Sequence, residues 1–193
     1  IPLHFSFSCC HNTFIVNTND DLELEKVLMR ELIQRSIDGM IIAPSNNIKE
    51  LIPILLETHI PVVFTDRPGD ENADFVGVDN VKESENLIQS FTKKPKRLIA
   101  LVPNPSDVST IQDRIEGTKM ACEKEGIEFD YIDLSSKQEE VNEQIKIELD
   151  KGADSFVALN NKCTLPTLTA LNKAKAVIPV NVRLISFDDN EAF

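Results

Sequence analysis

Short apolar runs alternate with amphipathic segments along the chain, and turn-forming residues separate them. Residues 39–43 and 61–66 are apolar runs of strand length, which is typical of strands buried on both faces of a parallel sheet. Between such runs, apolar residues recur every three or four positions, the spacing of one helix face. We expect strands at residues 14–17, 39–43, 61–66, 75–80, 98–102, 129–134, 154–159 and 183–188, and helices around 24–32, 48–56, 81–93, 110–125, 139–150 and 165–176.

Local signals mark two of the helix starts. Asp20 is followed three positions later by Glu23, which is the capping-box spacing and predicts a helix that begins after Asp20. Pro53 lies within the next helical segment, where it would remove a backbone hydrogen bond and cost on the order of 3 kcal/mol in a helix interior. That helix is therefore either kinked at Pro53 or begins later than its apolar pattern suggests.

The alternation of strands and helices predicts an α/β fold of parallel sheets covered by helices on both faces. Each side of about residue 80 has its own alternation, so two similar lobes are expected, at residues 1–79 and 80–193. In such folds, ligands bind outside the carboxyl ends of the strands. The polar residues that end predicted strands are therefore candidates for binding; they include Ser45, Asp66, Asp79, Asn80, Asn104, Asn160 and Asp188.

Composition and charge narrow the function. The chain has 193 residues, with 32 acidic and 20 basic side chains and a net charge of −12. A duplex-binding protein needs a basic face, so direct binding of nucleic acid by this segment is not expected. No run of 18 apolar residues predicts a membrane span. Residues 1–16 lack the basic region and small-residue cleavage site of a signal peptide.

Cysteine, histidine and glycine are placed in ways that exclude several kinds of site. The four cysteines, two of them adjacent, form no C-x-x-C motif, so reduced, buried thiols in a cytosolic protein are expected. The histidines have no zinc-binding spacing. No G-x-G-x-x-G, Walker or G-x-S-x-G motif is present. We therefore expect no cofactor and no metal. The cysteines are Cys9, Cys10, Cys122 and Cys163, and the histidines are His4, His11 and His59.

Five segments in order carry a resemblance to a known family. They are residues 37–45, 60–68, 75–80, 114–117 and 182–189. Together they resemble the effector-binding core of the lactose/galactose/purine repressor family (LacI/GalR type), and the resemblance covers roughly residues 14–193. It implies a periplasmic-binding-protein-like clamshell, with a sugar or a similar metabolite in the cleft between the lobes. It also implies a cytoplasmic homodimer that reads operator DNA through an N-terminal helix-turn-helix outside this chain.

The resemblance also assigns roles to single residues. Arg114 matches a guanidinium that grips effector hydroxyls, which suits its planar fork of donors. Asp188 matches a carboxylate that accepts hydrogen bonds from the effector, and Asp189 is read as structural. Thr110, one helical turn before Arg114, matches a hydroxyl of the site, although a cap role is equally open. Further effector-binding positions, each weighed against a turn role, are Asn160, Asp66, Asp79 and Ser45.

The chain departs from the family pattern in two respects. Leu134 stands where the family usually has an aromatic residue that stacks on the effector, and the chain has no Trp and only one Tyr. About ten residues separate residues 1–3 from residues 14–16, fewer than a βαβ crossover needs. Either the N-terminal lobe has lost a helix, or residues of the protein are missing from the sequence at this point, and the second is the preferred interpretation. The N-terminal lobe is therefore expected to be incomplete, and the C-terminal lobe to lack its return strands.

Two other classes of function remain open at this point. One is an extracytoplasmic sugar-binding protein with the same lobes, which an upstream secretion signal would identify. The other is an enzyme that uses Asp66 or Asp188 as a base or nucleophile, or a phosphoaspartate receiver. A receiver needs an acid pair after its first strand and a Lys after its last strand, and the sequence shows neither clearly. A sensor that is not an enzyme is the preferred interpretation.

Overall fold

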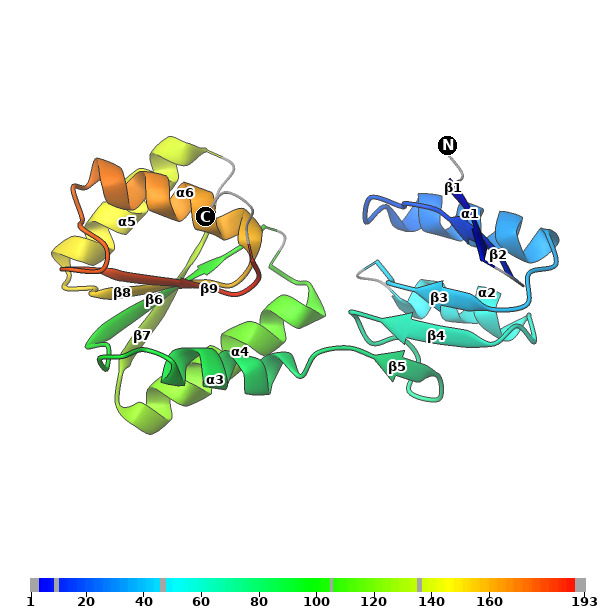
Figure 1. Ribbon diagram of the computed structural model, residues 1–193, viewed down its shortest axis with the longest axis horizontal. Helices are drawn as coiled ribbons and strands as arrows, with labels where there is room; N and C mark the ends of the chain where they lie inside the picture. The colour runs from blue at the N-terminus through cyan, green and yellow to red at the C-terminus, as the bar shows by residue number, and fades with distance from the viewer. Residues whose placement is uncertain (1–3, 9–10, 46–47, 105, 135–136, 190–193) are drawn as a thin grey trace. The chain divides into compact units, whose positions relative to one another are not determined.

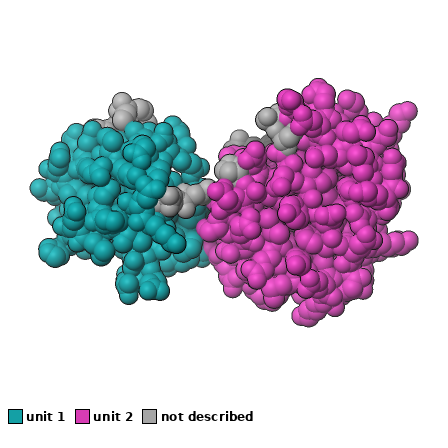
Figure 2. All heavy atoms as spheres, turned by 180° about the vertical axis from the view of Figure 1, so that it is seen from behind, with its two compact units in different colours: residues 1–77 teal, residues 78–193 magenta. Residues whose placement is uncertain are grey.

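The computed structural model describes residues 4–8, 11–45, 48–104, 106–134 and 137–189 (Figure 1). Contacts within the chain group it into two compact units, Ile1–Gly77 (unit 1) and Val78–Phe193 (unit 2), which are coloured separately in Figure 2. Within the described residues, no helix is both long and apolar enough to span a membrane. Each unit is described below by itself.

Unit 2 is built on a four-stranded sheet in which all neighbouring strands are parallel. Its order is β7-β6-β8-β9, which places the two fully buried strands in the centre. The strands are β6 (Arg97–Val102), β7 (Glu128–Asp133), β8 (Ser155–Ala158) and β9 (Arg183–Ser186). The sequence predicted each of them to within about two residues. The apolar runs at β6 and β8 reflect cover on both faces of these central strands.

Helices cover both faces of this sheet (Figure 1). One face packs against α3 (Asn80–Gln89) and α4 (Ser109–Glu125). The other packs against α5 (Gln138–Asp150) and α6 (Asn161–Lys173). The α/β architecture predicted from the alternation is therefore confirmed. Since each crossover begins where a strand ends, the N-termini of α4, α5 and α6 meet the carboxyl-end edge of the sheet.

A glycine allows α3 and α4 to approach closely. A Cβ atom added at Gly117 of α4 would lie 2.2 Å from the carbonyl oxygen of Val81 in α3. Real Cβ atoms essentially never come so close to backbone, so any side chain at this position would push the helices apart. Gly117 thereby fixes α3, and the residues at its start, against α4.

Unit 1 contains a smaller parallel sheet of order β3-β4-β5. Its strands are β3 (Met40–Ile42), β4 (Val62–Thr65) and β5 (Asp74–Val76), and its helices are α1 (Leu22–Gln34), η1 (Ile48–Glu50) and α2 (Ile52–Leu56). Met29 of α1 and Leu51, at the start of α2, join Phe64 of β4 in one buried cluster. The core of unit 1 thus lies on one face of its sheet.

The prediction that residues 39–43 form a strand buried on both faces is wrong. Ile41 is 80% exposed, whereas its neighbours Met40 and Ile42 are buried. Alternate residues of a strand point to opposite faces, and the described helices of unit 1 cover only the face that Met40 and Ile42 share. The apolar run therefore predicted a strand correctly but did not predict that one of its faces is exposed.

The strand predicted at residues 14–17 lies earlier and does not join a parallel sheet. It is β2 (His11–Ile15), which pairs with β1 (His4–Ser8) in antiparallel orientation. Only residues 9 and 10, which lie outside the described residues, separate the two strands in the sequence. Such a short connection allows a hairpin, while a parallel pair needs a crossover of a dozen residues or more.

Several predicted element ends are also corrected. Asp21, not Asp20, caps α1, with its Oδ1 accepting hydrogen bonds from the backbone N–H groups of Glu23 and Leu24. Pro53 is the second residue of α2, so the later start is confirmed, since a first-turn proline costs no helical hydrogen bond. Helix α6 begins at Asn161 rather than at 165, because the side chain of Asn160 caps it.

Candidate effector-binding site

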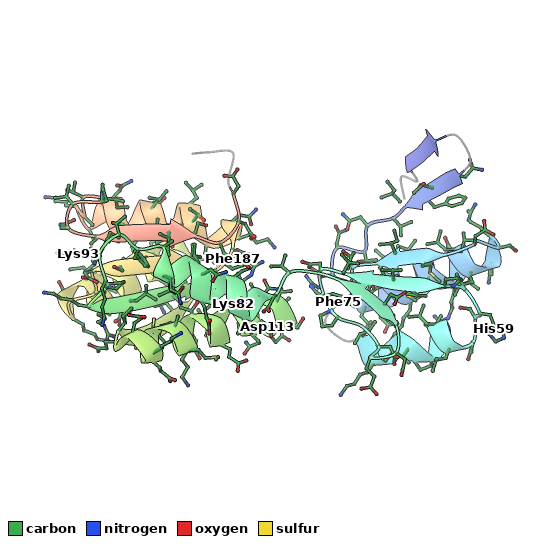
Figure 3. The ribbon with its side chains drawn as sticks, turned by 60° about the horizontal axis from the view of Figure 1, so that its bottom comes forward. His59, Phe75, Lys82, Lys93, Asp113 and Phe187 are labelled. Atoms are coloured by element: carbon green, nitrogen blue, oxygen red, sulfur yellow. The ribbon has the colours of Figure 1, made fainter. Side chains whose placement is uncertain are left out.

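The carboxyl-end edge of the unit 2 sheet collects the polar residues that the sequence singled out in this half of the chain. Leu159 and Asn160 follow β8, and Phe187 and Asp188 follow β9. Helix α4, which starts after the loop that leaves β6, brings Arg114 to the same edge. Phe187 lies at the opposite end of unit 2 from Lys93, which precedes β6 at the other edge (Figure 3).

Arg114 is the centre of this edge. Its Nε donates to Asn80 Oδ1 at 2.8 Å, and its Nη1 donates to the carbonyl oxygen of Leu159 at 2.6 Å. Nη1 also pairs with Asp188 Oδ2 at 3.3 Å. The side chain is 11% exposed, so these contacts hold a largely buried guanidinium. Three segments distant in the sequence therefore meet at one side chain.

An aromatic ring completes the environment of Arg114. The guanidinium carbon lies 3.7 Å from the centroid of the Phe187 ring, which is a cation–π contact. The stack removes one face of the guanidinium plane from solvent. Leu134, at the position where the family has an aromatic residue, is instead buried in the core between the sheet and α5. Phe187 is thus the aromatic group that the described residues place beside Arg114.

Asp188 offers the accessible carboxylate of the site. Its backbone has a φ of 68°, in the left-handed region that non-glycine residues seldom adopt. Its side chain is 40% exposed and touches Arg114 through one oxygen only. A carboxylate has several further lone-pair positions, so Asp188 can accept hydrogen bonds from hydroxyl groups while it remains paired with Arg114.

Thr110 and Asn160 flank the pair. Thr110 is the second residue of α4, one turn before Arg114, and is buried. Asn160 caps α6, with its Oδ1 accepting from the backbone N–H of Lys162 at 2.8 Å. This cap contact uses only the Asn160 oxygen, so its side-chain amide N–H groups are not used in it.

Asp79 belongs to unit 2 and caps α3. Its Oδ1 accepts from the backbone N–H of Lys82 at 3.0 Å. It also acts on Asp113 in α4: burial, then the charges of Glu116 and Asp79, raise the pKa of Asp113 above its ordinary value. The start of α3 and the first turns of α4 thus carry a concentration of negative charge beside the site.

The two remaining candidates, Ser45 and Asp66, lie in unit 1. The Ser45 N–H donates to a carboxylate oxygen of the buried Glu25 at 3.1 Å, while its Oγ has no hydrogen-bond partner among the described residues. Asp66 follows β4, has a φ of 64° and lies 3.7 Å from Arg67 Nε. Both residues therefore lie at the carboxyl-end edge of the unit 1 sheet.

Neither a reactive cysteine nor a metal-binding cluster is found among the described residues. Burial raises the pKa of the Cys122 thiol to about 12, and burial likewise raises that of Cys163 to about 12, so neither forms a reactive thiolate near neutral pH. No group of three or more His, Cys, Asp or Glu in the described ranges could hold a metal ion. Cys9 and Cys10 lie outside these ranges.

Comparison with known proteins decides the family. Residues 9–182 match the family described as periplasmic binding proteins and sugar binding domain of LacI family. The chain belongs to this family. The LacI/GalR resemblance of the sequence is thereby confirmed, and the fold agrees with solved members: a LacI transcriptional regulator from Lactobacillus brevis has a TM-score of 0.77 at 22% identity, covering 91% of this chain and 69% of that one.

Both a transcriptional regulator and a ligand-binding protein are similar to this chain. The probable HTH-type transcriptional regulator EndR of Paenibacillus polymyxa is 27% identical over 183 residues, covering 91% of this chain and 54% of that protein. A Caulobacter myo-inositol binding protein bound to myo-inositol has a TM-score of 0.72 at 19% identity, covering 90% of this chain and 63% of that one. The chain spans about half the length of the curated relatives it matches. Those relatives are transcriptional regulators rather than enzymes, in agreement with the prediction.

Sequence reasoning missed Phe187 and did not keep Asn80 among the effector-binding residues. Both contact Arg114; Asn80 is one of the polar residues at a predicted strand end, while Phe187 was read only as part of a strand. Their positions did carry a signal, because Asn80 directly follows Asp79 and Phe187 directly precedes Asp188. Neighbours of a candidate binding residue at a strand end therefore merit the same attention as the residue itself.

Proposed function

We propose that this chain is the effector-sensing domain of a LacI-type transcriptional regulator and binds a small, neutral, polyhydroxylated molecule through Arg114 and Asp188. The observation that carries the proposal is the Arg114–Asp188 pair on the ring of Phe187, at the carboxyl-end edge of a parallel sheet. Thr110 and Asn160 flank this pair and supply further polar groups. Ser45, Asp66 and Asp79 remain proposed members of the binding set.

The contacts of Arg114 favour a neutral effector over an anionic one. Recognition of a carboxylate or phosphate by Arg uses two parallel N–H groups of its fork. Here Nε is occupied by Asn80 and Nη1 by Leu159 and Asp188, so Nη2 is the nitrogen that these contacts leave for a ligand. A single donor beside an accessible carboxylate suits a hydroxyl group, which can accept from one and donate to the other.

The charge around the pair points the same way. Asp188 already balances Arg114, and the first turns of α3 and α4 add Asp79, Asp113 and Glu116. A phosphorylated sugar would bring further negative charge into this environment. Neutral sugars and polyols avoid that cost, since their hydroxyl groups replace water without adding charge.

Thermal shift with a defined panel tests the class of effector. The chain is heated with D-glucose, D-galactose, D-ribose, D-xylose, maltose or myo-inositol, and with the phosphate esters glucose 6-phosphate and ribose 5-phosphate. We expect at least one neutral compound to raise the midpoint temperature of unfolding, because a ligand that binds only the folded state stabilises it. We expect the esters to leave that midpoint unchanged. Stabilisation by an ester alone would overturn the neutral-effector proposal.

In the complete protein, we propose a cytoplasmic homodimer whose helix-turn-helix heads, outside this chain, bind operator DNA under control of the effector. A gel-shift assay of the full-length protein, with and without the stabilising sugar, tests this role. A sugar-dependent change in DNA affinity is expected. A secretion signal in the full-length gene would instead identify an extracytoplasmic binding protein, the second candidate, which family membership equally allows.

A further inference from the structure

Asn80 of α3 accepts a hydrogen bond from the Arg114 side chain. It is the first residue of that helix and is 5% exposed. Its Oδ1 accepts from Arg114 Nε at 2.8 Å, while its Nδ2 donates to the carbonyl oxygen of Val78 at 3.2 Å. Both ends of the amide are therefore engaged, which also fixes the orientation of the amide itself.

The bond to Nε determines the plane of the Arg114 guanidinium. Nε is the atom nearest the aliphatic stem, so a partner there sets the rotation of the whole planar group. With the plane set by Asn80 and one face on Phe187, Nη2 can point in only one general direction. Without Asn80, a largely buried Nε–H would lose its acceptor, and the guanidinium would turn to find another.

Asn80 also joins Arg114 to the segment that connects the units along the chain. Unit 1 ends at Gly77 and unit 2 begins at Val78, whose carbonyl oxygen receives the Asn80 amide. Two hydrogen bonds in series therefore link the guanidinium to that segment. The close approach of Gly117 to Val81 keeps the start of α3 in register with α4.

We infer that Asn80 is a positioning residue for effector binding. It orients Arg114, and it couples the binding of an effector at Arg114 to the conformation of residues 77–80. The inference rests on the function proposed above, because it assigns Asn80 its role through Arg114. An effector that hydrogen-bonds to Nη2 changes the hydrogen bond between Arg114 Nε and Asn80 Oδ1. The same Asn80 amide donates to the carbonyl oxygen of Val78, so the change reaches that residue.

A measurement without any effector tests the positioning itself. Hydrogen exchange of the Arg114 Nε–H is followed by ¹⁵N NMR, with the signal assigned by its loss in Arg114→Lys. We expect exchange roughly ten times faster or more in Asn80→Leu, because the acceptor is gone. Asn80→Asp, which keeps an acceptor oxygen, restores slow exchange. Asn86→Leu is the matched control, since Asn86 is an exposed residue of the same helix and its side-chain amide donates to the Glu83 carboxylate.

The binding arm uses whichever neutral sugar of the panel stabilises the wild-type chain. By calorimetric titration, Asn80→Leu is expected to weaken its binding about tenfold or more, a change of about 1.4 kcal/mol. Asn80→Asp and Asn86→Leu should bind within about threefold of wild type. Sugar should also slow backbone amide exchange at residues 77–80 in wild type but not in Asn80→Leu.

The outcomes separate this inference from the proposed function. Unchanged Arg114 Nε–H exchange in Asn80→Leu, or equal sugar affinity, overturns the positioning role. If no panel sugar binds the wild-type chain, the proposed function fails, while the exchange measurement still decides whether Asn80 fixes Arg114. If Asn80→Leu does not fold, Asn80→Ala, which also lacks the acceptor, takes its place in both measurements.

Discussion

At the scale of single residues, a buried cation determines the character of each edge of the unit 2 sheet. At the carboxyl-end edge, Arg114 contacts Asn80, Leu159 and Asp188 through Nε and Nη1, and these contacts leave Nη2 for a ligand. At the opposite edge, Arg97 is enclosed by Glu148, Glu128 and Asp130. The first arrangement suits a ligand, and the second holds β6, β7 and α5 together.

The acid stability of the protein depends on Glu148. Burial by itself would raise its pKa, but hydrogen bonds from Lys151 and Arg97 outweigh burial and lower the pKa below its ordinary value of 4.5. A carboxylate with a lowered folded pKa stabilises the fold above its unfolded pKa, and this contribution is lost as the pH falls through the folded pKa. Glu148→Gln is therefore expected to cost about 3 kcal/mol at pH 7, and less as the pH falls below 4.5.

Urea unfolding of wild type and variants between pH 7 and pH 3 measures this difference. Glu128→Gln is the matched control, because Glu128 pairs with the same Arg97 but its side chain is 66% exposed. Its substitution should cost under about 1 kcal/mol at every pH, as for most surface ion pairs. A Glu148→Gln penalty that stays constant across the pH range would contradict the account.

At the scale of elements, the contact between α3 and α4 places both Asn80 and Arg114. Alanine normally stabilises a helix interior by about 1 kcal/mol relative to glycine. At Gly117 we expect the opposite, a loss of roughly 1–3 kcal/mol, because the new Cβ would meet the Val81 carbonyl oxygen. Urea unfolding of Gly117→Ala checks the sign, and Glu116→Ala, at an exposed position of the same helix, should change stability little. Stabilisation by Gly117→Ala would show that the helices are not in close contact.

The elements also show how far sequence alone could reach. The buried strands β6 and β8 were predicted because an apolar run has one structural meaning when helices cover both faces. The same signal misled at Ile41, since composition reports the tendency to be buried and not the presence of a cover. Asp188 was found from its place after a predicted strand, and the family resemblance added Arg114 and assigned a role to each. Asn80 also follows a predicted strand, but its role could not be predicted because it depends on a partner 34 positions away in the chain.

At the scale of the whole molecule, the two units differ in how their sheets are covered. The unit 2 sheet has a buried cluster on each face, and all residues of β6 are buried. Unit 1 has one cluster among its described residues, and all three residues of β5 are exposed. Burial on both faces should give unit 2 the greater local stability.

Native-state hydrogen exchange compares the two sheets. The backbone amides of β6 are expected to exchange at least roughly ten times more slowly than those of β3 and β4, since opening unit 1 exposes less apolar surface. Helix α4, which carries Arg114, should follow β6 because it packs on that strand. Equal protection of β4 and β6 would show that both units unfold in one cooperative step.

Calorimetric titration with the stabilising sugar tests most directly whether Arg114 binds a neutral effector. The proteins compared are wild type, Arg114→Lys and Arg183→Lys. Arg183 is the matched control: it also stacks on a ring, that of Phe91, and pairs with Asp154, but it does so at the opposite edge of the same sheet. Arg114→Lys is expected to lose at least about tenfold in affinity, or about 1.4 kcal/mol, with Arg183→Lys close to wild type. Wild-type affinity in Arg114→Lys, or an equal loss in both variants, would contradict the account.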